Sequence, residues 1–271
     1  MAGATSAGHP PRRKRFGQHF LHDPAVIERI VRALEVRAGD HLVEIGPGRG
    51  ALTARLLESG GSTLDAIEID RDLAARLRER FPPRARWALH QSDALQFDFS
   101  ALAAARGGRL RILGNLPYNI STPLLFHLLA HAAAIADLTV MLQREVVARI
   151  AAAPGDDDYG RLTVMLAPHA EVRRLFDVGP GAFQPVPRVW SAVVRLTMRP
   201  APPFPVSPHY AAVVSAAFAQ RRKTLRNALS QMLSRDEIAA CAIDPGARPE
   251  TLPPAAFNTL ALALDRARAG R

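Results

Sequence analysis

Several features that would narrow the function are scarce or missing in this chain of 271 residues. It has one cysteine, Cys241, so it cannot form an internal disulfide or a cysteine cluster around a metal ion. Its richest apolar stretch, 123–142, is interrupted by His127, His131 and Asp137, which argues against a membrane span. The N-terminus lacks the apolar core of a signal peptide. We therefore expect a cytoplasmic protein with no membrane contact and no metal.

Acidic residues are absent from the first 22 positions, which contain the basic run 12–15. The whole chain carries a formal net charge of +10 and has a sequence pI of about 11.1. Such an excess of positive charge attracts an anionic partner such as a nucleic-acid backbone. The four charges at 12–15 alone would equally suit a solubilising tail. We expect residues 1–15 to form a disordered basic arm.

Glycines follow the first predicted strand, 41–45, in the pattern Gly46-Pro47-Gly48-Arg49-Gly50. A helix is expected from position 51 to about 59. Glycines let the backbone approach a ligand, and the start of the helix presents free N–H groups. The spacing differs from the dinucleotide motif Gly-x-Gly-x-x-Gly because position 51 is alanine. The pattern therefore favours a nucleotide-binding α/β fold over a dehydrogenase that uses NAD.

Polar side chains stand at the ends of the next three predicted strands. Glu68 is placed to bind both hydroxyls of a ribose, Asp93 could accept an adenine amino group, and Asn115 follows in a turn. Taken singly, Glu68 could be a solvated charge and Asp93 a helix cap. Because the carboxyl ends of parallel strands meet at one edge of a sheet, together they predict a nucleoside site at that edge.

The turn 114–119 reads Gly-Asn-Leu-Pro-Tyr-Asn and suits a flat ring that carries an exocyclic amine. The side-chain oxygen of Asn115 can accept one N–H of the amine. Pro117 stiffens the backbone, so that a carbonyl at Leu116 or Pro117 can face the ligand. Tyr118 offers a face for stacking. The alternative, for this turn alone, is an ordinary loop between a strand and a helix.

A second aromatic ring is predicted beside this turn. Phe183 begins the proline-rich segment Phe-Gln-Pro-Val-Pro-Arg, 183–188. We expect this loop to expose Phe183 next to the site, where it would supply the second face of a base sandwich. Packing of Phe183 within its own loop is the alternative.

The predicted fold is α/β, Rossmann-like, with a mostly parallel seven-stranded sheet and a small all-α C-terminal domain. The strands are expected near 41–45, 64–69, 85–89, 110–113, 138–142, 171–176 and 191–198. Prolines cluster at 200–208 and predict a linker, followed by helices over 210–233, 235–241 and 254–268. We predict an arm at 1–15, a catalytic domain at 16–199, and a helical domain at 200–271 that either binds nucleic acid or supports the first.

Eight segments, taken in order from about residue 12 to 230, resemble the ribosomal small-subunit RNA adenine dimethyltransferases. They are Gly17-Gln-His-Phe-Leu21, Glu44-Ile-Gly-Pro-Gly48, Ile67-Glu-Ile-Asp70, Asn115-Leu-Pro-Tyr-Asn-Ile-Ser121, Gln143-Arg-Glu-Val146, Tyr159-Gly-Arg161, Phe183-Gln-Pro-Val-Pro187 and Phe218-Ala-Gln-Arg-Arg-Lys-Thr-Leu-Arg226. The resemblance implies a class I methyltransferase that uses S-adenosylmethionine. It further implies N6,N6-dimethylation of two adjacent adenosines near the 3′ end of 16S rRNA in an assembling small ribosomal subunit. We expect a monomer.

The resemblance also implies which residues bind the cofactor. They are His19, Leu21, Gly46, Glu68, Asp93 and Asn115. The family more often has Asn where this chain has His19, so that contact requires the imidazole to reach the cofactor. The catalytic residues are expected to be Asn115, Leu116, Pro117, Tyr118 and Phe183.

Three rival functions share part of this pattern. DNA adenine methyltransferases usually carry Asp-Pro-Pro-Tyr or Asn-Pro-Pro-Tyr, whereas Leu116 stands here. The large-subunit resistance methyltransferases share the fold and a similar Asn-x-Pro-Tyr, but the segment 220–226 is not associated with them. A non-catalytic assembly factor would explain the basic arm and the helical module, while Glu68, Asp93, Asn115 and Tyr118 argue for catalysis.

Overall fold

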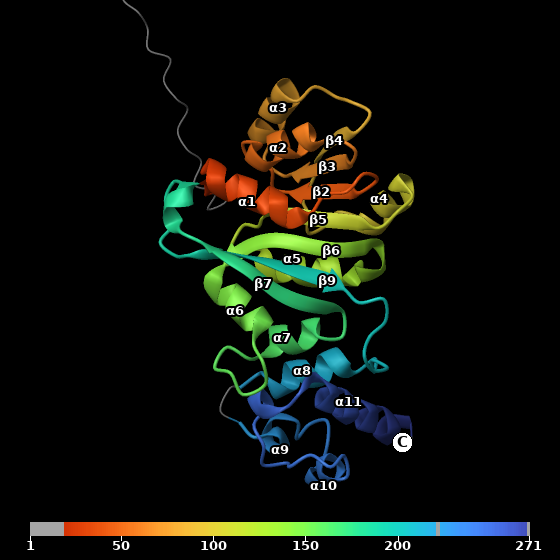
Figure 1. Ribbon diagram of the computed structural model, residues 1–271. Coiled ribbons are helices and arrows are strands. Elements are labelled where there is room, and N and C mark those ends of the chain that lie inside the picture. The colour runs from red at the N-terminus through yellow and green to blue at the C-terminus, as the bar shows by residue number, and fades with distance from the viewer. Residues whose placement is uncertain (1–18, 221–222, 270–271) are drawn as a thin grey trace, which may run out of the picture.

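The computed structural model describes residues 19–220 and 223–269, so the arm predicted at 1–15 lies outside the described residues. The elements follow one another in the order β1 Phe20–Leu21, α1 Pro24–Leu34, β2 His41–Ile45, α2 Ala51–Ser59, β3 Thr63–Glu68, α3 Arg71–Arg80, β4 Trp87–Gln91, α4 Phe99–Arg106, β5 Leu110–Asn115, α5 Ser121–Ala130, η2 Ala132–Ala134, β6 Ile135–Gln143, α6 Arg144–Ala151, α7 Arg161–Leu166, β7 Ala170–Val178, η3 Pro180–Ala182, β8 Phe183–Gln184, β9 Ser191–Met198, α8 Tyr210–Ala217, α9 Leu225–Ala228, α10 Arg235–Ala239, η4 Pro249–Thr251 and α11 Pro254–Ala269 (Figure 1).

Seven strands form the main sheet in the order β4-β3-β2-β5-β6-β9-β7. The pairs from β4 to β6 are parallel, and β9 runs antiparallel to both of its neighbours. The strand order reverses at β2, which pairs with β3 on one side and β5 on the other. In open α/β sheets ligands bind at such a reversal, outside the carboxyl ends of the strands. The predicted Rossmann-like, mostly parallel sheet of seven strands is therefore confirmed.

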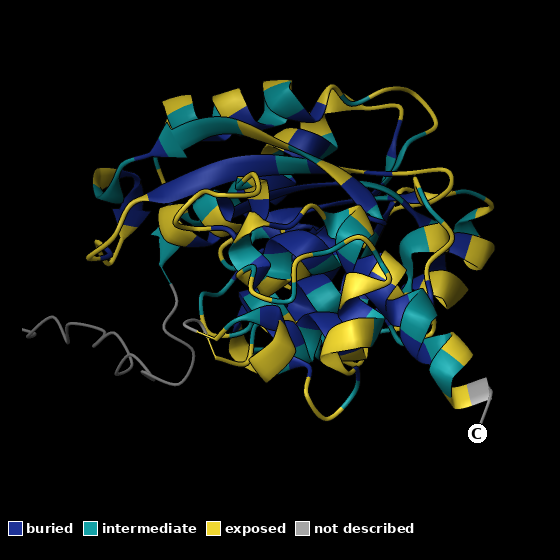
Figure 2. Cartoon of the chain, turned by 90° about the horizontal axis from the view of Figure 1, so that it is seen from below, coloured by how far each residue is buried: buried dark blue, intermediate teal, exposed yellow. Residues whose placement is uncertain are grey.

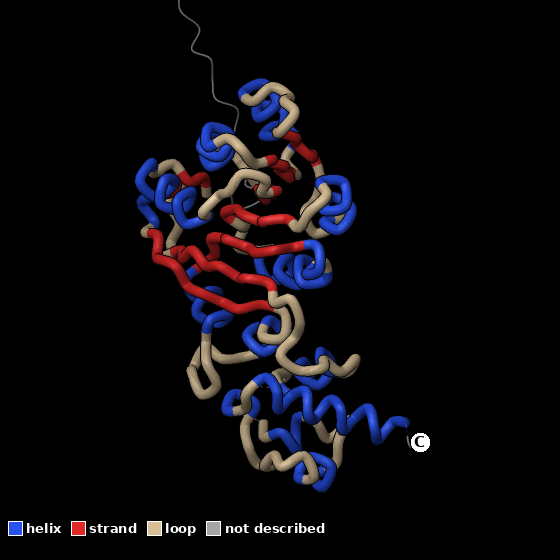
Figure 3. The backbone as a smooth tube through the Cα atoms, turned by 45° about the vertical axis from the view of Figure 1, so that its right-hand side comes forward, coloured by secondary structure: helices blue, strands red, loops and turns tan. Residues whose placement is uncertain are grey.

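Helices cover both faces of this sheet (Figure 3). One apolar cluster joins α1, α2 and α3 to one face, and another joins α4, α5 and α6 to the other. Neighbouring residues of a strand point to opposite faces, so Leu42 belongs to the first cluster and Val43 to the second. Both side chains are fully buried, as expected of parallel strands covered on both sides. Figure 2 shows buried segments along the strands of the sheet.

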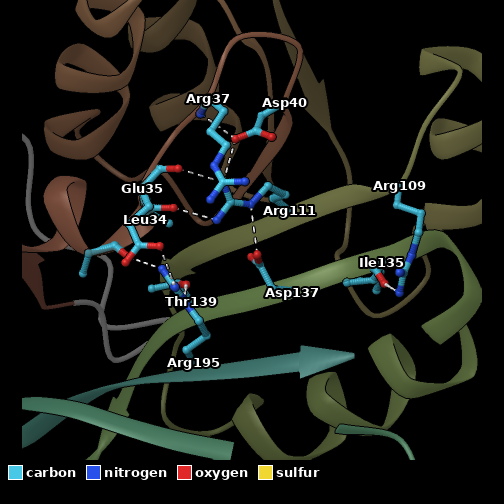
Figure 4. Close-up of polar contacts among 11 residues, drawn as sticks. Leu34, Glu35, Arg37, Asp40, Arg109, Arg111, Ile135, Asp137, Thr139 and Arg195 are labelled. Atoms are coloured by element: carbon cyan, nitrogen blue, oxygen red, sulfur yellow. Dashed lines mark hydrogen bonds and ion pairs between the residues drawn. The ribbon is translucent and has the colours of Figure 1, made fainter. Parts of the chain in front are cut away.

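Two arginines on neighbouring parts of the sheet hold the end of α1 (Figure 4). The Arg111 guanidinium, on β5, donates to the carbonyl oxygens of Leu34 and Glu35 at 2.6 and 3.3 Å. It also pairs with Asp40 and Asp137 at 2.6 and 3.0 Å. The carbonyls at the end of a helix lack partners within the helix, so these bonds satisfy them.

Arg195, on β9, extends the same cluster. It donates to the carbonyl oxygen of Ala33, and it lies 3.3 Å from the hydroxyl of Thr139 and 3.4 Å from the carboxylate of Glu35. The two arginines thus anchor α1 to the sheet from two strands, and residues 19–21, shortly before α1, line the pocket described below.

The C-terminal helices have an apolar core of their own, which also takes in Tyr159 and Val164 from the α6–α7 region. The Tyr159 hydroxyl donates to the carbonyl of Leu252 at 2.7 Å, and the Tyr210 hydroxyl donates to the carbonyl of Val164 at 2.8 Å. Because this core crosses residue 200, the domain boundary predicted there stays a prediction. No helix of the described chain is long and apolar enough to cross a membrane.

The single helix predicted over 210–233 is wrong. Helix α8 ends at Ala217, and α9 begins again after Thr224, whose backbone is extended (φ −71°, ψ 160°). The first N–H groups of α9, at Leu225 and Arg226, donate to the carbonyls of Ala247 and Pro245 at 2.9 and 3.0 Å. Carbonyls of a loop about 20 residues further along the chain therefore accept the N–H groups that a preceding helical turn would otherwise bond.

Candidate active site

A cavity of about 220 Å³ opens at the carboxyl edge of the sheet, next to the strand reversal at β2. The residues that line it are His19, Phe20, Leu21, Glu44, Ile45, Gly46, Pro47, Gly48, Arg49, Ala51, Leu52, Ile67, Glu68, Ile69, Ser92, Asp93, Ala94, Leu95, Asn115, Leu116, Pro117, Tyr118, Asn119 and Ile120. All the predicted site residues are among them except Phe183. The sequence therefore located this cavity correctly, from four separate strand ends.

The glycine turn after β2 forms one wall of the cavity. Gly48 has a left-handed backbone (φ +56°), and a Cβ there would lie 3.0 Å from the ring of Phe20. A side chain at position 48 would therefore be strained and would collide with the opposite wall. Glycine at this position keeps open a space in which a ligand can lie against the backbone.

Glu68, at the end of β3, is 3% exposed and holds this wall in place. One carboxylate oxygen accepts the N–H of Gly48 at 3.1 Å, and the other accepts the N–H of Asp70 at 3.0 Å. Each oxygen has a second lone pair, so the carboxylate can still accept two hydroxyl groups. Burial raises the pKa of this carboxyl, although the backbone N–H groups of Asp70, Gly48 and Ile69 act in the opposite direction.

Glu44 also lines the cavity, and the sequence reasoning gave it no role in the site. It is 2% exposed and accepts the hydroxyl of Thr53 at 2.6 Å. Burial raises the pKa of Glu44 to about 7, and the nearby Glu68 carboxylate adds to the rise. The available signal was an acidic residue inside the apolar strand 41–45, directly before the glycine turn. A buried acidic residue beside a cleft is a candidate for function.

Asp93 fits both interpretations given in the sequence analysis, a capping residue and an acceptor for a ligand. One of its oxygens accepts the N–H of Leu95 at 2.9 Å, as a turn-capping residue does. The residue also lines the cavity. Its other oxygen has no hydrogen bond within the described residues and can accept one from a ligand.

The turn after β5 presents one free acceptor from a side chain and one from the backbone. The Asn115 amide nitrogen donates to the carbonyl of His19 at 3.0 Å, which orients the amide and leaves its oxygen without a partner in the described chain. The N–H of Leu116 donates to Met141 O at 3.1 Å, and Ile120 N–H donates to Pro117 O at 3.1 Å. No donor among the described residues contacts Leu116 O, so this carbonyl is the open one of the two that the sequence proposed.

Two rings flank this turn. The Tyr118 hydroxyl is hydrogen-bonded to the hydroxyl of Ser191 at 3.0 Å. The His19 ring stacks near Tyr118, with 5.9 Å between ring centroids and 30° between planes. His19 Nδ1–H donates to the carbonyl of Pro185 at 2.7 Å, so the imidazole is anchored at the cavity wall. Both rings are held by the protein without occupying the cavity.

The predicted place of Phe183 is wrong. This residue is 0% exposed, belongs to the apolar cluster under α1, and does not line the cavity. The reason is a short antiparallel pairing of β1 with β8, in which Leu21 lies opposite Phe183. Phe183 is a packing residue, as the alternative held, but it packs against helices and the sheet rather than within its own loop.

The cavity fits S-adenosylmethionine in the chemistry of its walls: an open glycine turn, a buried carboxylate with free lone pairs, and an edge where Asp93 has one carboxylate oxygen without a partner in the described chain. The fold and this site define a class I methyltransferase that uses S-adenosylmethionine. Among solved structures, a dimethyladenosine transferase from Plasmodium falciparum has the same fold (TM-score 0.77, 22% identity, covering 92% of this chain and 98% of that one). The 23S rRNA methyltransferase ErmE is also similar (TM-score 0.69, 28% identity, covering 91% and 99%).

Sequence comparison narrows the class further. The profile of the family described as ribosomal RNA adenine dimethylase matches residues 11–266. The ribosomal RNA small subunit methyltransferase A of Pseudomonas aeruginosa is 56% identical over 256 residues, covering 92% of this chain and 93% of the relative. The protein of the same name from Hahella chejuensis is 53% identical over 247 residues, covering 90% and 89%. The chain belongs to the ribosomal RNA adenine dimethylase family, and it is an S-adenosylmethionine-dependent enzyme that methylates rRNA.

Proposed function

We propose that this enzyme places two methyl groups on the N6 amine of each of two adjacent adenosines near the 3′ end of 16S rRNA. Its substrate is the assembling small ribosomal subunit, on which it acts as a monomer in the cytoplasm. Relatives at 53–56% identity carry the name small subunit methyltransferase A, which supports the choice of subunit. The observation that carries the chemistry is the pair of open acceptors, Asn115 Oδ1 and Leu116 O, at the cavity wall.

On the cofactor side, Glu68 binds the ribose hydroxyls and Gly46 leaves the backbone open to the ligand. Asp93 accepts the adenine amino group, while His19 and Leu21 close the cavity opposite the glycine turn. Asn115 stands at the junction with the substrate side. All six residues line the same cavity.

On the substrate side, Asn115 Oδ1 and Leu116 O accept the two N–H groups of the target amine. The lone pair of that amine is delocalised into the adenine ring, which makes it a poor nucleophile. Holding both N–H groups fixes the amine so that its lone pair, which lies perpendicular to the ring plane, points toward the methyl group. Alignment of this kind is worth on the order of 7–11 kcal/mol in favourable model systems.

Pro117 and Tyr118 keep this arrangement rigid. Pro117 has a fixed φ, and Tyr118 stacks on one face of the adenine while Ser191 holds its hydroxyl. S-adenosylmethionine supplies an activated methyl group when bound, so the chain need not create an electrophile. The methylated amine is strongly acidic and loses its proton to water, so no general base is required.

We further propose that residues 16–199 form the catalytic domain and that residues 200–271, together with the basic arm 1–15, contact the ribosomal RNA. The C-terminal residues 200–271 hold nine Lys and Arg against five Asp and Glu. This charge suits a phosphate backbone. A non-catalytic assembly factor is the competing function, and the basic segments alone fit it equally well.

The deciding experiment is a transfer assay with labelled S-adenosylmethionine on small subunits that lack the modification, followed by nucleoside analysis. We expect label in N6,N6-dimethyladenosine with the wild type and none with Asn115→Ala. Tight binding of the particle without transfer by the wild type would support the assembly factor instead. Transfer by Asn115→Ala at the wild-type rate would contradict the assignment of the site.

A further inference from the structure

The segment 185–190, which joins β8 to β9, exposes three apolar side chains. Val186, Val189 and Trp190 are 63%, 40% and 49% exposed. Among the large apolar side chains that are exposed in the described chain, Trp190 is the aromatic one. We call residues 185–190 the mouth loop. Exposed apolar groups gathered in one place mark contact surfaces.

Both ends of the mouth loop are bonded to residues that line the cavity. At one end the carbonyl of Pro185 accepts the Nδ1–H of His19 at 2.7 Å. At the other end Ser191, next to Trp190, is hydrogen-bonded to Tyr118 at 3.0 Å. The connection from β7 to β9 also lies beside the start of α1 in the ribbon (Figure 1). The mouth loop therefore borders the cavity, and its Ser191 end meets Tyr118 on the substrate side.

Trp190 is supported on one side and open on the other. Its carbonyl accepts the N–H of Arg144 at 2.9 Å, which fixes the backbone. A Cβ built on Gly179 would lie 3.7 Å from the six-membered ring of the indole, so the ring rests close to the backbone of Gly179. About half of the residue is nevertheless exposed, at 49%. A ring held in this way is ready to stack without first being ordered.

Two arginines lie close to Trp190 along the backbone, and their guanidinium groups have no partner in the described chain. Arg188 lies within the mouth loop, and Arg144 begins α6, where its N–H meets Trp190. Both side chains are exposed, and neither guanidinium has a hydrogen bond or ion pair among the residues that the structure describes. An aromatic platform next to unpaired guanidinium groups is the combination by which proteins hold single-stranded nucleic acid.

We propose that Trp190 stacks on an unpaired rRNA base that flanks the adenosine held at Asn115, with Arg144 and Arg188 on the adjoining phosphates. The inference rests on the proposed function, since it concerns the strand that delivers that adenosine. It assigns Trp190 to substrate binding, outside the group that contacts the reacting amine. The basic residues position the strand, and the indole holds one base beside the cavity.

The first test measures methyl-transfer kinetics on unmodified small subunits with Trp190→Ala and Trp190→Phe. We expect Trp190→Ala to raise KM about tenfold, the loss typical of one stacked base, with kcat changed less than about twofold. Trp190→Phe should restore most of the affinity, and the affinity for S-adenosylmethionine should not change. Glu79→Ala, at an exposed position of α3 outside both the mouth loop and the cavity wall, is the control and should match the wild type. An unchanged KM in Trp190→Ala, or an equal rise in Trp190→Phe, would overturn the proposal.

The second test does not depend on methyl transfer, so it separates failure of this proposal from failure of the proposed function. The chain has two tryptophans, and the other one, Trp87, is 5% exposed with its ring N–H bonded to Phe81 O. Titration with a short oligoadenylate should quench the emission of the wild type and leave that of Trp190→Phe unchanged. Absence of quenching, with KM still raised in Trp190→Ala, would indicate that the indole contacts a ribosomal protein. That result would overturn base stacking.

Discussion

The two ends of strand β5 carry polar side chains that are used in opposite ways. At the amino end, all three nitrogens of the Arg111 guanidinium bond to groups of the protein, two carboxylates and two helix carbonyls (Figure 4). At the carboxyl end, the amide nitrogen of Asn115 donates to the carbonyl of His19, and the amide oxygen has no partner in the described chain. Both residues are partly exposed. On this strand, the polar side chain paired within the protein anchors α1, and the one with an unpaired acceptor lines the cavity.

The first prediction removes the Arg111 side chain, at the amino end of β5. Arg111→Met would leave Asp40 and Asp137 without their partner, and burial already raises the pKa of Asp137 although Arg111 acts against it. Removing one member of a buried ion pair costs about 3–5 kcal/mol. We expect a loss of this order in the free energy of unfolding, measured by urea denaturation, with kcat at 25 °C kept within about threefold because Arg111 is remote from the cavity.

The control is Arg32→Met, which removes an arginine of α1 whose side chain is 77% exposed and, within the described residues, is paired only with Glu28. We expect little change in stability, because solvent screens such a pair. If Arg111→Met abolished activity while the protein stayed as stable as the wild type, the contrast between the two ends of β5 would be lost.

The second prediction tests the functional end with a nearly isosteric change. Asn115→Asp keeps an acceptor but replaces the amide nitrogen with an oxygen that faces His19 O, now 3.0 Å from that nitrogen. The two oxygens repel, so the side chain turns and the amine acceptor is misplaced. A misplacement of about 1 Å can cost about 100-fold in rate, and we expect a fall of that size in kcat.

The measurement is single-turnover methyl transfer, with the thermal midpoint as a check on folding. Gln96→Glu, the same amide-to-carboxylate change at an exposed residue outside the cavity wall, serves as the matched control. Turnover in Asn115→Asp equal to that of the control would show that the orientation set by His19 does not matter.

The third prediction concerns the cofactor side of the cavity. Glu68→Gln removes the charge and one of the two acceptors that bond to Gly48 and Asp70. Hydrogen bonds to charged groups are worth about 1.5–3 kcal/mol, so affinity for S-adenosylmethionine should fall roughly thirtyfold. Isothermal calorimetry measures this, and Glu79→Gln, on the exposed face of α3, is the control. Binding as tight as that of the wild type would remove Glu68 from the site.

The sequence predicted only part of this arrangement. Features set by neighbouring residues were predicted, and features that depend on residues far apart in the chain were not. The strands, the glycine turn and the cavity residues were predicted because apolar runs, glycine spacing and strand ends are local signals. The role of Arg111 was not, because its partners Asp40 and Asp137 lie 71 and 26 positions away. Phe183 failed for the same reason, since its burial depends on a pairing with Leu21, far earlier in the chain.

The last prediction concerns Glu44, a buried carboxyl group of the cavity wall. It accepts a hydrogen bond from Thr53, and its pKa is nevertheless raised. Burial raises the pKa of Glu44 from its ordinary 4.5 to about 7. Between these two values the folded protein binds a proton that the unfolded chain has lost, so stability falls as the pH rises through this window and levels off above it. Glu44→Gln cannot titrate and still offers Thr53 an acceptor. Its stability relative to the wild type should therefore rise by about 2 kcal/mol from pH 5 to pH 7. Urea denaturation across this range measures the difference, and Glu58→Gln, on the exposed end of α2, should show no such trend. Parallel curves for Glu44→Gln and the wild type would mean that Glu44 stays ionised at the cavity wall, in which case its charge belongs with the groups left open for the ligand.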